Sequence, residues 1–385
     1  MDAVRRGLVQ AADPVVVKVG TNVLADASGL LDRRRIESLA GQLLRLRAGG
    51  RRVVLVTSGA IGAGIGRLGL SGRPTDLSQL QACAAVGQTA LMQMYQDALA
   101  PHGILAAQVL LTAGDFDHRV RYLNVRNTLR TLFEYSCLPI INENDTVSTA
   151  EIKFGDNDQL AAMTANLLLA PLLILLTNVD GLFTADPQLD STAILQTTVE
   201  RIDAAVSDLA GATKSGLGTG GMKSKLKAAR IATSAGTAVI MANGAVDGIL
   251  DRLFASEPVG TLFLPKVDAV SARKRWLGFT ARPRGELMLD AGAVIAVRLQ
   301  GKSLLPVGVT KVIGDFSKGD VLVMNDADGR EVARGITNYG AVDAEKIAGV
   351  KTDRIAAVLG KLPYVELIHR DHLVVTTPGA LDLVP

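Results

Sequence analysis

Cysteine, histidine and aromatic residues are scarce in this chain of 385 residues. It contains two cysteines, four histidines and one tryptophan. Cys83 and Cys137 lie in alanine-rich or apolar sequence, a setting that suits buried free thiols of a reducing compartment better than a disulfide framework. We therefore expect a cytoplasmic protein.

Long apolar segments and blocks of like charge are also missing. The stretch "LLLAPLLILL" (167–176) is far too short to span a bilayer. An aspartate and a proline interrupt the N-terminal region, where a signal peptide needs an unbroken apolar core. The net charge is only +3, and the like-charge runs are limited to "RRR" (33–35) and "RKR" (273–275). We expect no membrane or targeting segment, and composition alone does not indicate nucleic-acid binding.

The chain has ample apolar material for packed cores, since 48% of its residues are hydrophobic and 21% are charged. Its length exceeds one ordinary domain of roughly 100 to 200 residues, so two domains are expected. Apolar runs of strand length alternate with helix-like stretches. The runs are 14–20, 51–59, 104–111, 137–142, 172–177 and 237–243, and the helix-like stretches include 32–48, 76–100, 119–135, 156–170 and 222–235.

This alternation of apolar strands and helices indicates a parallel sheet covered on both faces. We predict an α/β fold for residues 1–265, a three-layer αβα sandwich with a mostly parallel central sheet. After a linker at 266–275, short β-like segments and Gly or Asp-Gly turns predict a small, mostly β domain at 276–370. One of these segments is "GELMLDAGAVIAVRLQG" (285–301), and a C-terminal tail is expected at 371–385.

The residues that follow the strands are the expected ligand-binding loops, because doubly wound sheets bind ligands beyond the carboxyl ends of their strands. Three of these loops, "KVGTN", "TSGAIGAGIGRLG" and "KSGLGTGGMKSK", are rich in glycine. Glycines let backbone N–H groups approach an anion, and helix starts favour one. With Lys18 and Lys225 as added positive charges, the loops suit a phosphoryl group in transfer.

Rival motifs are weaker. "GIGRLG" (64–69) fits a dinucleotide pattern but begins eight residues past the strand, and no acid lies between Asp76 and Asp97 to hold a ribose. "AVRLQGKS" (296–303) lacks the first glycine of a phosphate-binding loop, and "DNDQLA" (156–161) lacks the glycine of a calcium loop. "HRDH" (369–372) has no other nearby metal ligands.

Three of the featured residues also have plainer interpretations. Lys18 could extend from an edge strand into solvent, although its place before Gly20 favours function. Ser58 could only cap the following helix, and Asp156 could be an N-cap residue, a role compatible with membership of the site.

Six ordered motifs closely resemble the amino acid kinase superfamily, in particular the glutamate 5-kinases: "VVVKVGTNVL", "VVLVTSGAIGAG", "PIINENDTVS", "IKFGDNDQLAA", "LLTNVDGLFTADP" and "GTGGMKSKLKAA". The region from "RKRWLGFTARPRGELMLDAGA" to "GITNYGAVDAEKIAG" resembles a PUA domain. The resemblance implies transfer of the γ-phosphate of ATP to the side-chain carboxylate of L-glutamate, the first step of proline biosynthesis, with proline as inhibitor.

The resemblance also assigns residues. It puts Lys18 and Lys225 on the ATP phosphates, with Asp158 holding the two lysines. Glutamate would be held by Ser58, Asp145 and Asn157. The nucleotide would lie beside Thr177 and Asn178 and against the turn and helix start formed by Thr219, Gly220, Gly221, Met222, Lys223 and Ser224. Many relatives have aspartate in place of Asn178 and a Ser-Thr pair in place of Lys223 and Ser224.

The implied chemistry needs no general base, because a carboxylate nucleophile is already anionic at neutral pH. Magnesium should arrive with ATP rather than occupy a protein cage. Backbone N–H groups around Gly20 and Gly59 are candidates for stabilising the moving phosphoryl group. Glu143 and Glu151 are expected to shape a loop or a proline-responsive surface.

Two alternatives stay open. Within the superfamily, an aspartate, acetylglutamate or uridylate kinase would carry similar motifs. A PUA-like domain also occurs in RNA-binding and RNA-modifying proteins, so RNA contact is a further expectation, although the region lacks a marked aromatic-basic stacking set. The resemblance implies a homo-oligomer, a dimer or a tetramer.

Overall fold

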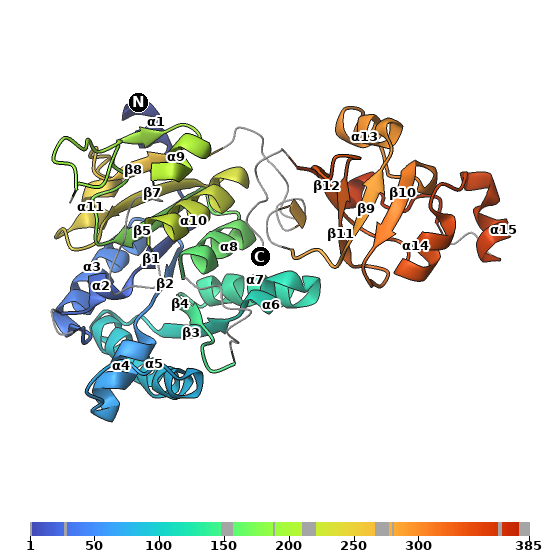
Figure 1. Ribbon diagram of the computed structural model, residues 1–385. Helices are drawn as coiled ribbons and strands as arrows, with labels where there is room; N and C mark the ends of the chain where they lie inside the picture. Colours follow the sequence, from blue (N-terminus) through green and yellow to red (C-terminus); the bar gives the residue numbers. More distant parts are fainter. Residues whose placement is uncertain are drawn as a thin grey trace. The chain divides into compact units, whose positions relative to one another are not determined.

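The computed structural model describes residues 2–26, 29–147, 157–187, 189–209, 221–265, 277–278, 281–360 and 364–376. The chain divides into two compact units, Met1–Ala269 and Val270–Pro385, each described here by itself (Figure 1). The exact domain boundaries expected from the sequence remain predictions, and the expected linker, 266–275, lies outside the described residues.

An eight-stranded sheet forms the centre of the larger unit, in the order β3-β4-β2-β1-β5-β7-β8-β6. The first six strands in this order pair in parallel, β8 is antiparallel to β7, and β6 is parallel to β8. The mostly parallel sheet predicted from the sequence is therefore confirmed. The strands are β1 (Val15–Val19), β2 (Val53–Val56), β3 (Ala106–Leu111), β4 (Leu138–Glu143), β5 (Leu172–Thr177), β6 (Thr198–Val199), β7 (Ala238–Asn243) and β8 (Thr261–Phe263).

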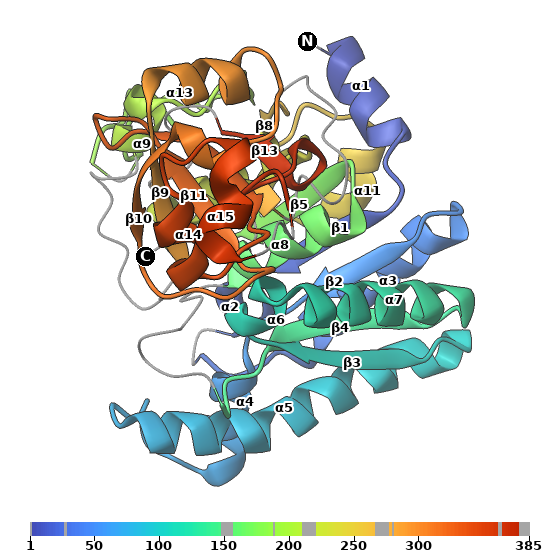
Figure 2. The same ribbon diagram turned by 90° about the vertical axis from the view of Figure 1, so that its right-hand side faces the viewer.

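Helices cover both faces of this sheet, which confirms the three-layer prediction (Figure 1). One layer contains α7 (Arg119–Glu134), α8 (Asn157–Leu168) and α10 (Met222–Ser234), and the other contains α3 (Arg33–Ala48), α5 (Leu77–Leu99) and α11 (Ile249–Phe254). Figure 2 shows α5 and α7 on opposite sides of β3 and β4. Shorter helices complete the unit: α1 (Asp2–Gln10), α2 (Thr21–Leu24), α4 (Ala60–Leu68), η1 (Ala100–His102), α6 (Ala113–Asp117) and α9 (Ala204–Leu209).

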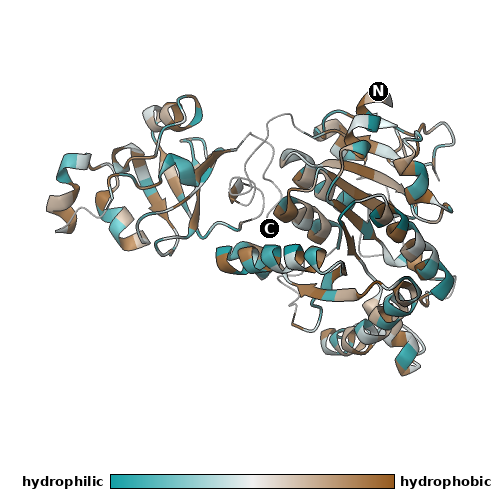
Figure 3. Cartoon of the chain, turned by 180° about the vertical axis from the view of Figure 1, so that it is seen from behind, coloured by the Kyte–Doolittle hydropathy of each residue, from teal (hydrophilic) through white to brown (hydrophobic). Residues whose placement is uncertain are grey.

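The central strands are apolar because both of their faces are covered. Every residue of β1 and β5 is buried, and Figure 3 shows these strands predominantly in the hydrophobic colour. Their side chains join those of α3 and α5 in one core. Asp32 and Asp76 begin α3 and α5 by accepting hydrogen bonds from the backbone N–H groups of Arg34 and Ser78, as N-cap residues do.

Helix packing requires one glycine of "GIGRLG", Gly64. The glycines of this motif lie in and just after α4, where a Cβ atom added to Gly64 would come within 1.8 Å of the Cys83 carbonyl oxygen on α5. A Cβ added to Gly87 of α5 would come within 1.8 Å of the Ala60 carbonyl oxygen. The two helices therefore cross with their backbones in close contact.

The smaller unit has a five-stranded sheet in the order β10-β9-β11-β12-β13. Neighbouring strands are antiparallel except for the parallel pair β9 and β11. The mostly β character predicted for this part of the chain is confirmed. Its elements are β9 (Gly285–Leu289), α13 (Ala291–Arg298), η2 (Pro306–Gly308), β10 (Val309–Ile313), β11 (Val321–Asn325), β12 (Glu331–Ile336), α14 (Ala341–Ile347), η3 (Thr352–Arg354), α15 (Ile355–Leu359), η4 (Arg370–His372) and β13 (Leu373–Val375).

Two sequence expectations for the smaller unit need correction. Residues 291–298 form helix α13 instead of continuing the β-like segment, because the Asp290 carboxylate accepts a hydrogen bond from the Ala293 N–H at 2.6 Å and starts a helix. The expected tail, 371–385, also contains a strand of this sheet, because β13 pairs with β12.

Cys83 is buried, Cys137 is partly buried, and both are free thiols as predicted. Within the described part of the chain, the structure has no helix that is long and apolar enough to cross a membrane.

Candidate active site

A buried carboxylate bridges two lysines at the carboxyl edge of the larger sheet. Asp158 is fully buried, with its Oδ1 atom 2.5 Å from Lys18 Nζ and its Oδ2 atom 3.1 Å from Lys225 Nζ. The two lysines are 4% and 8% exposed. Two cations around one anion leave a net positive charge in a place with little water, where electrostatic interactions are strong.

Three elements far apart in sequence bring these charges together. Lys18 is the fourth residue of β1, between β2 and β5. Asp158 is the second residue of α8, which packs over β1 and β5, and Lys225 is the fourth residue of α10, which packs against α8. The trio predicted from the sequence is thus assembled by the crossing of α8 and α10 over the sheet.

A second group of polar side chains adjoins the trio through Asn157, the residue before Asp158. The Asn157 Nδ2 atom donates to Ser58 Oγ at 3.0 Å and to Asn142 Oδ1 at 3.1 Å. Asn142 lies on β4 and is 2% exposed. Two of the residues predicted to hold glutamate, Ser58 and Asn157, are therefore in direct contact.

The third predicted glutamate ligand, Asp145, lies half-buried in the turn after β4. Glu143, at the end of β4, is buried. Glu151 and Asp156 lie outside the described residues.

The two glycines proposed as backbone donors differ. Gly59 has φ +108°, a left-handed conformation that favours glycine, and it caps the start of α4. The Gly20 N–H donates to the Leu176 carbonyl oxygen at 3.2 Å. That bond occupies the N–H of Gly20 itself, because a backbone N–H supplies a single donor. Donation to a phosphoryl group by backbone N–H groups around Gly20 and Gly59 stays a prediction.

Of the predicted nucleotide contacts, Thr177 is buried at the end of β5 and Asn178 is exposed beside it. Their side chains are joined by a hydrogen bond of 3.3 Å from Thr177 Oγ1 to Asn178 Oδ1. Gly221 is the N-cap residue of α10, and Met222, Lys223 and Ser224 form the first turn of that helix. Thr219 and Gly220 lie outside the described residues.

The start of α10 is rich in positive charge. Lys223, Lys225 and Lys227 alternate along it, and burial together with the charge of Lys223 lowers the pKa of Lys227. Positive side chains and the backbone N–H groups at the N-terminal end of a helix together favour an anionic ligand there.

Two residues near the site, both on α5, could not be identified as site neighbours from the sequence. Gln88, on the Ala-rich helix α5, accepts a hydrogen bond from Asn142 Nδ2 at 2.9 Å. Tyr95 of α5 is fully buried with its hydroxyl 2.9 Å from Thr57 Oγ1, and burial raises its pKa. A polar residue on the buried face of an apolar helix was the only available hint in either case.

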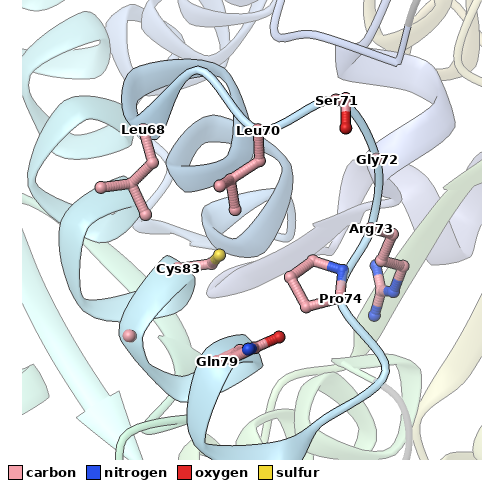
Figure 4. Close-up of a pocket in the computed structure, with 9 residues that line it drawn as sticks. Leu68, Leu70, Ser71, Gly72, Arg73, Pro74, Gln79 and Cys83 are labelled. Atoms are coloured by element: carbon pink, nitrogen blue, oxygen red, sulfur yellow. The ribbon is translucent and has the colours of Figure 1, made fainter.

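No group of three or more His, Cys, Asp or Glu side chains that could hold a metal ion occurs among the residues that the structure describes. A surface pocket of about 540 Å³ lies at the turn between α4 and α5, where Leu68, Leu70, Pro74 and Cys83 contribute to its lining (Figure 4). None of the predicted site residues lines this pocket.

Comparison with known protein families assigns a family to each of the two units. Residues 13–243 match the amino acid kinase family. The chain belongs to the amino acid kinase family. Residues 285–359, in the smaller unit, match the PUA domain.

Several curated relatives of this amino acid kinase cover nearly its whole length. A protein named glutamate 5-kinase from Pseudomonas fluorescens is 48% identical over 370 residues, which are 96% of this chain and 99% of the relative. Another glutamate 5-kinase, from Caldanaerobacter subterraneus subsp. tengcongensis, is 46% identical over 95% of this chain and 98% of its own. Among solved structures, a carbamate kinase from Giardia lamblia bound to AMP-PNP matches with a TM-score of 0.49 and 19% identity, covering 66% of this chain and 99% of that one.

Proposed function

We propose that this amino acid kinase transfers the γ-phosphate of ATP to the side-chain carboxylate of L-glutamate and so forms L-glutamyl 5-phosphate, the first step of proline biosynthesis. The family membership and the nearly full-length similarity to glutamate 5-kinases support this activity. The observation that carries the site assignment is the bridge of Asp158 between Lys18 and Lys225.

The two lysines bind the phosphates of ATP and neutralise the charge of the phosphoryl group as it moves. An ammonium group has three N–H donors in different directions, so each lysine can hold Asp158 and a phosphate oxygen together. Asp158 fixes the lysine positions before ATP arrives, which avoids reorganisation during the reaction. A buried anion would repel phosphate by itself, but here two cations outnumber it.

The glutamate side of the reaction uses the polar group around Asn157. Ser58 and Asn157 bind the amino acid, and the Asp145 carboxylate meets its α-ammonium group, where an anion strengthens the hydrogen bond. Because Asn157 and Asp158 are consecutive at the start of α8, one helix end aligns the glutamate with the lysines. Catalysis then consists of positioning and charge neutralisation, since the carboxylate nucleophile needs no base.

The nucleotide lies beside Thr177 and Asn178 and against the start of α10. Magnesium would arrive with ATP rather than occupy a protein cage, and it would supply positive charge that helps to neutralise the phosphates during transfer. Backbone N–H groups around Gly59, at the start of α4, stabilise the phosphoryl group as it moves. Proline inhibition, RNA contact through the PUA domain, a cytoplasmic location and a dimeric or tetrameric assembly remain predictions of the family resemblance.

An acyl phosphate trap tests this function. The purified protein is incubated with ATP, magnesium and L-glutamate, and hydroxylamine converts any glutamyl phosphate to a hydroxamate. We expect hydroxamate and glutamate-dependent ADP, and the absence of both would refute the proposal. Parallel reactions with aspartate, N-acetylglutamate or UMP in place of glutamate distinguish the related kinases.

A further inference from the structure

Helix α5 contributes a buried glutamine that points at the polar group around Asn157. Gln88 is 9% exposed, and its Oε1 atom accepts a hydrogen bond from Asn142 Nδ2 at 2.9 Å. Its Nε2 atom donates to Gln108 Oε1 at 3.0 Å, and Gln108 is exposed. A chain of side-chain amides therefore leads from the surface through Gln88 and Asn142 to Asn157 and Ser58.

The backbone N–H of Glu143 fixes the direction of each hydrogen bond between these side-chain amides. The Glu143 N–H donates to Asn142 Oδ1 at 2.9 Å, and a backbone N–H can only donate. Oδ1 of Asn142 is therefore the acceptor, so its Nδ2 must donate to Gln88. For the same reason Asn157 presents its Nδ2 to Asn142, and the Asn157 amide has only one orientation available.

The fixed orientation has a consequence for the ligand. With its Nδ2 engaged by Ser58 and Asn142, Asn157 is left with an acceptor, Oδ1, that has no hydrogen-bond partner within the described residues. A buried acceptor of this kind favours an N–H donor such as an α-ammonium group. If Asn142 could rotate, Asn157 could turn its amide and present N–H donors instead.

Close helix packing holds Gln88 in place. The preceding residue, Gly87, packs against the Ala60 carbonyl oxygen at the start of α4, where a Cβ atom would not fit. Ser58 and Gly59 lie immediately before α4. The position of Gln88 is thus tied to the loop that carries Ser58.

We propose that Gln88 is a positioning residue for glutamate binding, acting through Asn142 to fix the amide orientation of Asn157. The inference rests on the proposed function and names a residue that does not itself touch the reacting atoms. Lys18, Asp158 and Lys225 are not part of this chain of amides. Loss of Gln88 therefore weakens glutamate binding equally in the ground state and the transition state, which raises KM more than it lowers kcat.

The test is Gln88→Met, which removes the acceptor while retaining side-chain length. We expect the KM for glutamate to rise about tenfold, as for one lost buried hydrogen bond, while kcat and the KM for ATP change by less than about threefold. Gln88→Glu keeps an acceptor for Asn142, and the exposed Gln108 can turn its amide to donate to it. This variant should recover most of the glutamate affinity.

Gln42→Met is the matched control. Gln42 is also a buried helical glutamine, 5% exposed on α3, and its Oε1 accepts from the Leu250 N–H at 2.8 Å. Its loss should lower the melting temperature without changing the KM for glutamate. If Gln88→Met does not fold, Gln88→Ala removes the same acceptor and is assayed with the same expectation.

The outcomes separate the two proposals. An unchanged KM for glutamate in the Gln88 variant, or an equal rise in the Gln42 control, would overturn the positioning role. If the wild-type protein forms no hydroxamate at all, the proposed function fails and the inference fails with it.

Discussion

Replacement of Asp158 by asparagine gives the sharpest test of the charge arrangement. The fully buried carboxylate holds two buried lysines at 2.5 and 3.1 Å. Asparagine has the same shape but offers one acceptor oxygen, so one lysine keeps a partner and the other faces an N–H donor. Removing one member of a buried ion pair costs about 3 to 5 kcal/mol. Because one contact survives, we expect a loss of about 3 kcal/mol in the free energy of unfolding.

The loss should shrink when a ligand supplies the missing negative charge. Urea unfolding followed by far-UV circular dichroism, with and without magnesium and a non-hydrolysable ATP analogue, measures both values. We expect the variant to gain more stability from the nucleotide than the wild-type protein does, since the phosphates neutralise the lysines. Turnover in the hydroxamate assay should fall strongly, because the lysines lose their fixed positions.

Asp251→Asn provides the control, since it removes a carboxylate from an exposed pair. Asp251 lies 2.7 Å from Arg45, and their side chains are 39% and 58% exposed. Exposed pairs contribute up to about 1 kcal/mol. If Asp158→Asn cost no more than this control and kept its turnover, the bridging role of Asp158 would be refuted.

Three further predictions concern charge and packing. Lys18→Ala and Lys225→Ala should each reduce turnover far more than they raise the KM for glutamate, and unchanged turnover in both would remove them from the mechanism. Gly87→Ala should cost about 3 kcal/mol of stability, because its new Cβ atom meets backbone atoms. Gly72→Ala is the control: an added Cβ atom has nothing within 4 Å, so thermal unfolding should change very little. Equal effects of the two variants would contradict the close crossing of α4 and α5. Arg5 is 4% exposed and donates hydrogen bonds to four backbone carbonyl oxygens. Arg5→Ala should therefore lower the free energy of unfolding in urea by about 3 kcal/mol. A loss below about 0.5 kcal/mol would show that these bonds contribute nothing to stability.

The two site lysines could be predicted from the sequence because they stand in recognisable local settings, whereas the role of Asp158 was implied by the family resemblance. Lys18 stands near the end of an apolar strand, two residues before Gly20, and Lys225 lies in the first turns of a helix after a glycine-rich turn. The parallel sheet was equally predictable, since strands buried on both faces are apolar throughout. These patterns are local, so a single sequence contains them.

The amide chain and the helix crossing were decided only by tertiary structure. Gln88 and Gly87 stand in an alanine-rich helix whose sequence gives no sign that one faces Asn142 and the other meets the Ala60 backbone. Helix α13 was missed because its apolar, β-branched residues resemble a strand, and only the Asp290 cap distinguishes it. Asp158 shows the same division: the sequence placed it in an acid-rich stretch after a strand, but the packing of α8 against β1 and α10 set its two lysine partners. A hydrogen bond between distant residues depends on where two elements meet, and that geometry has no local signature in the chain.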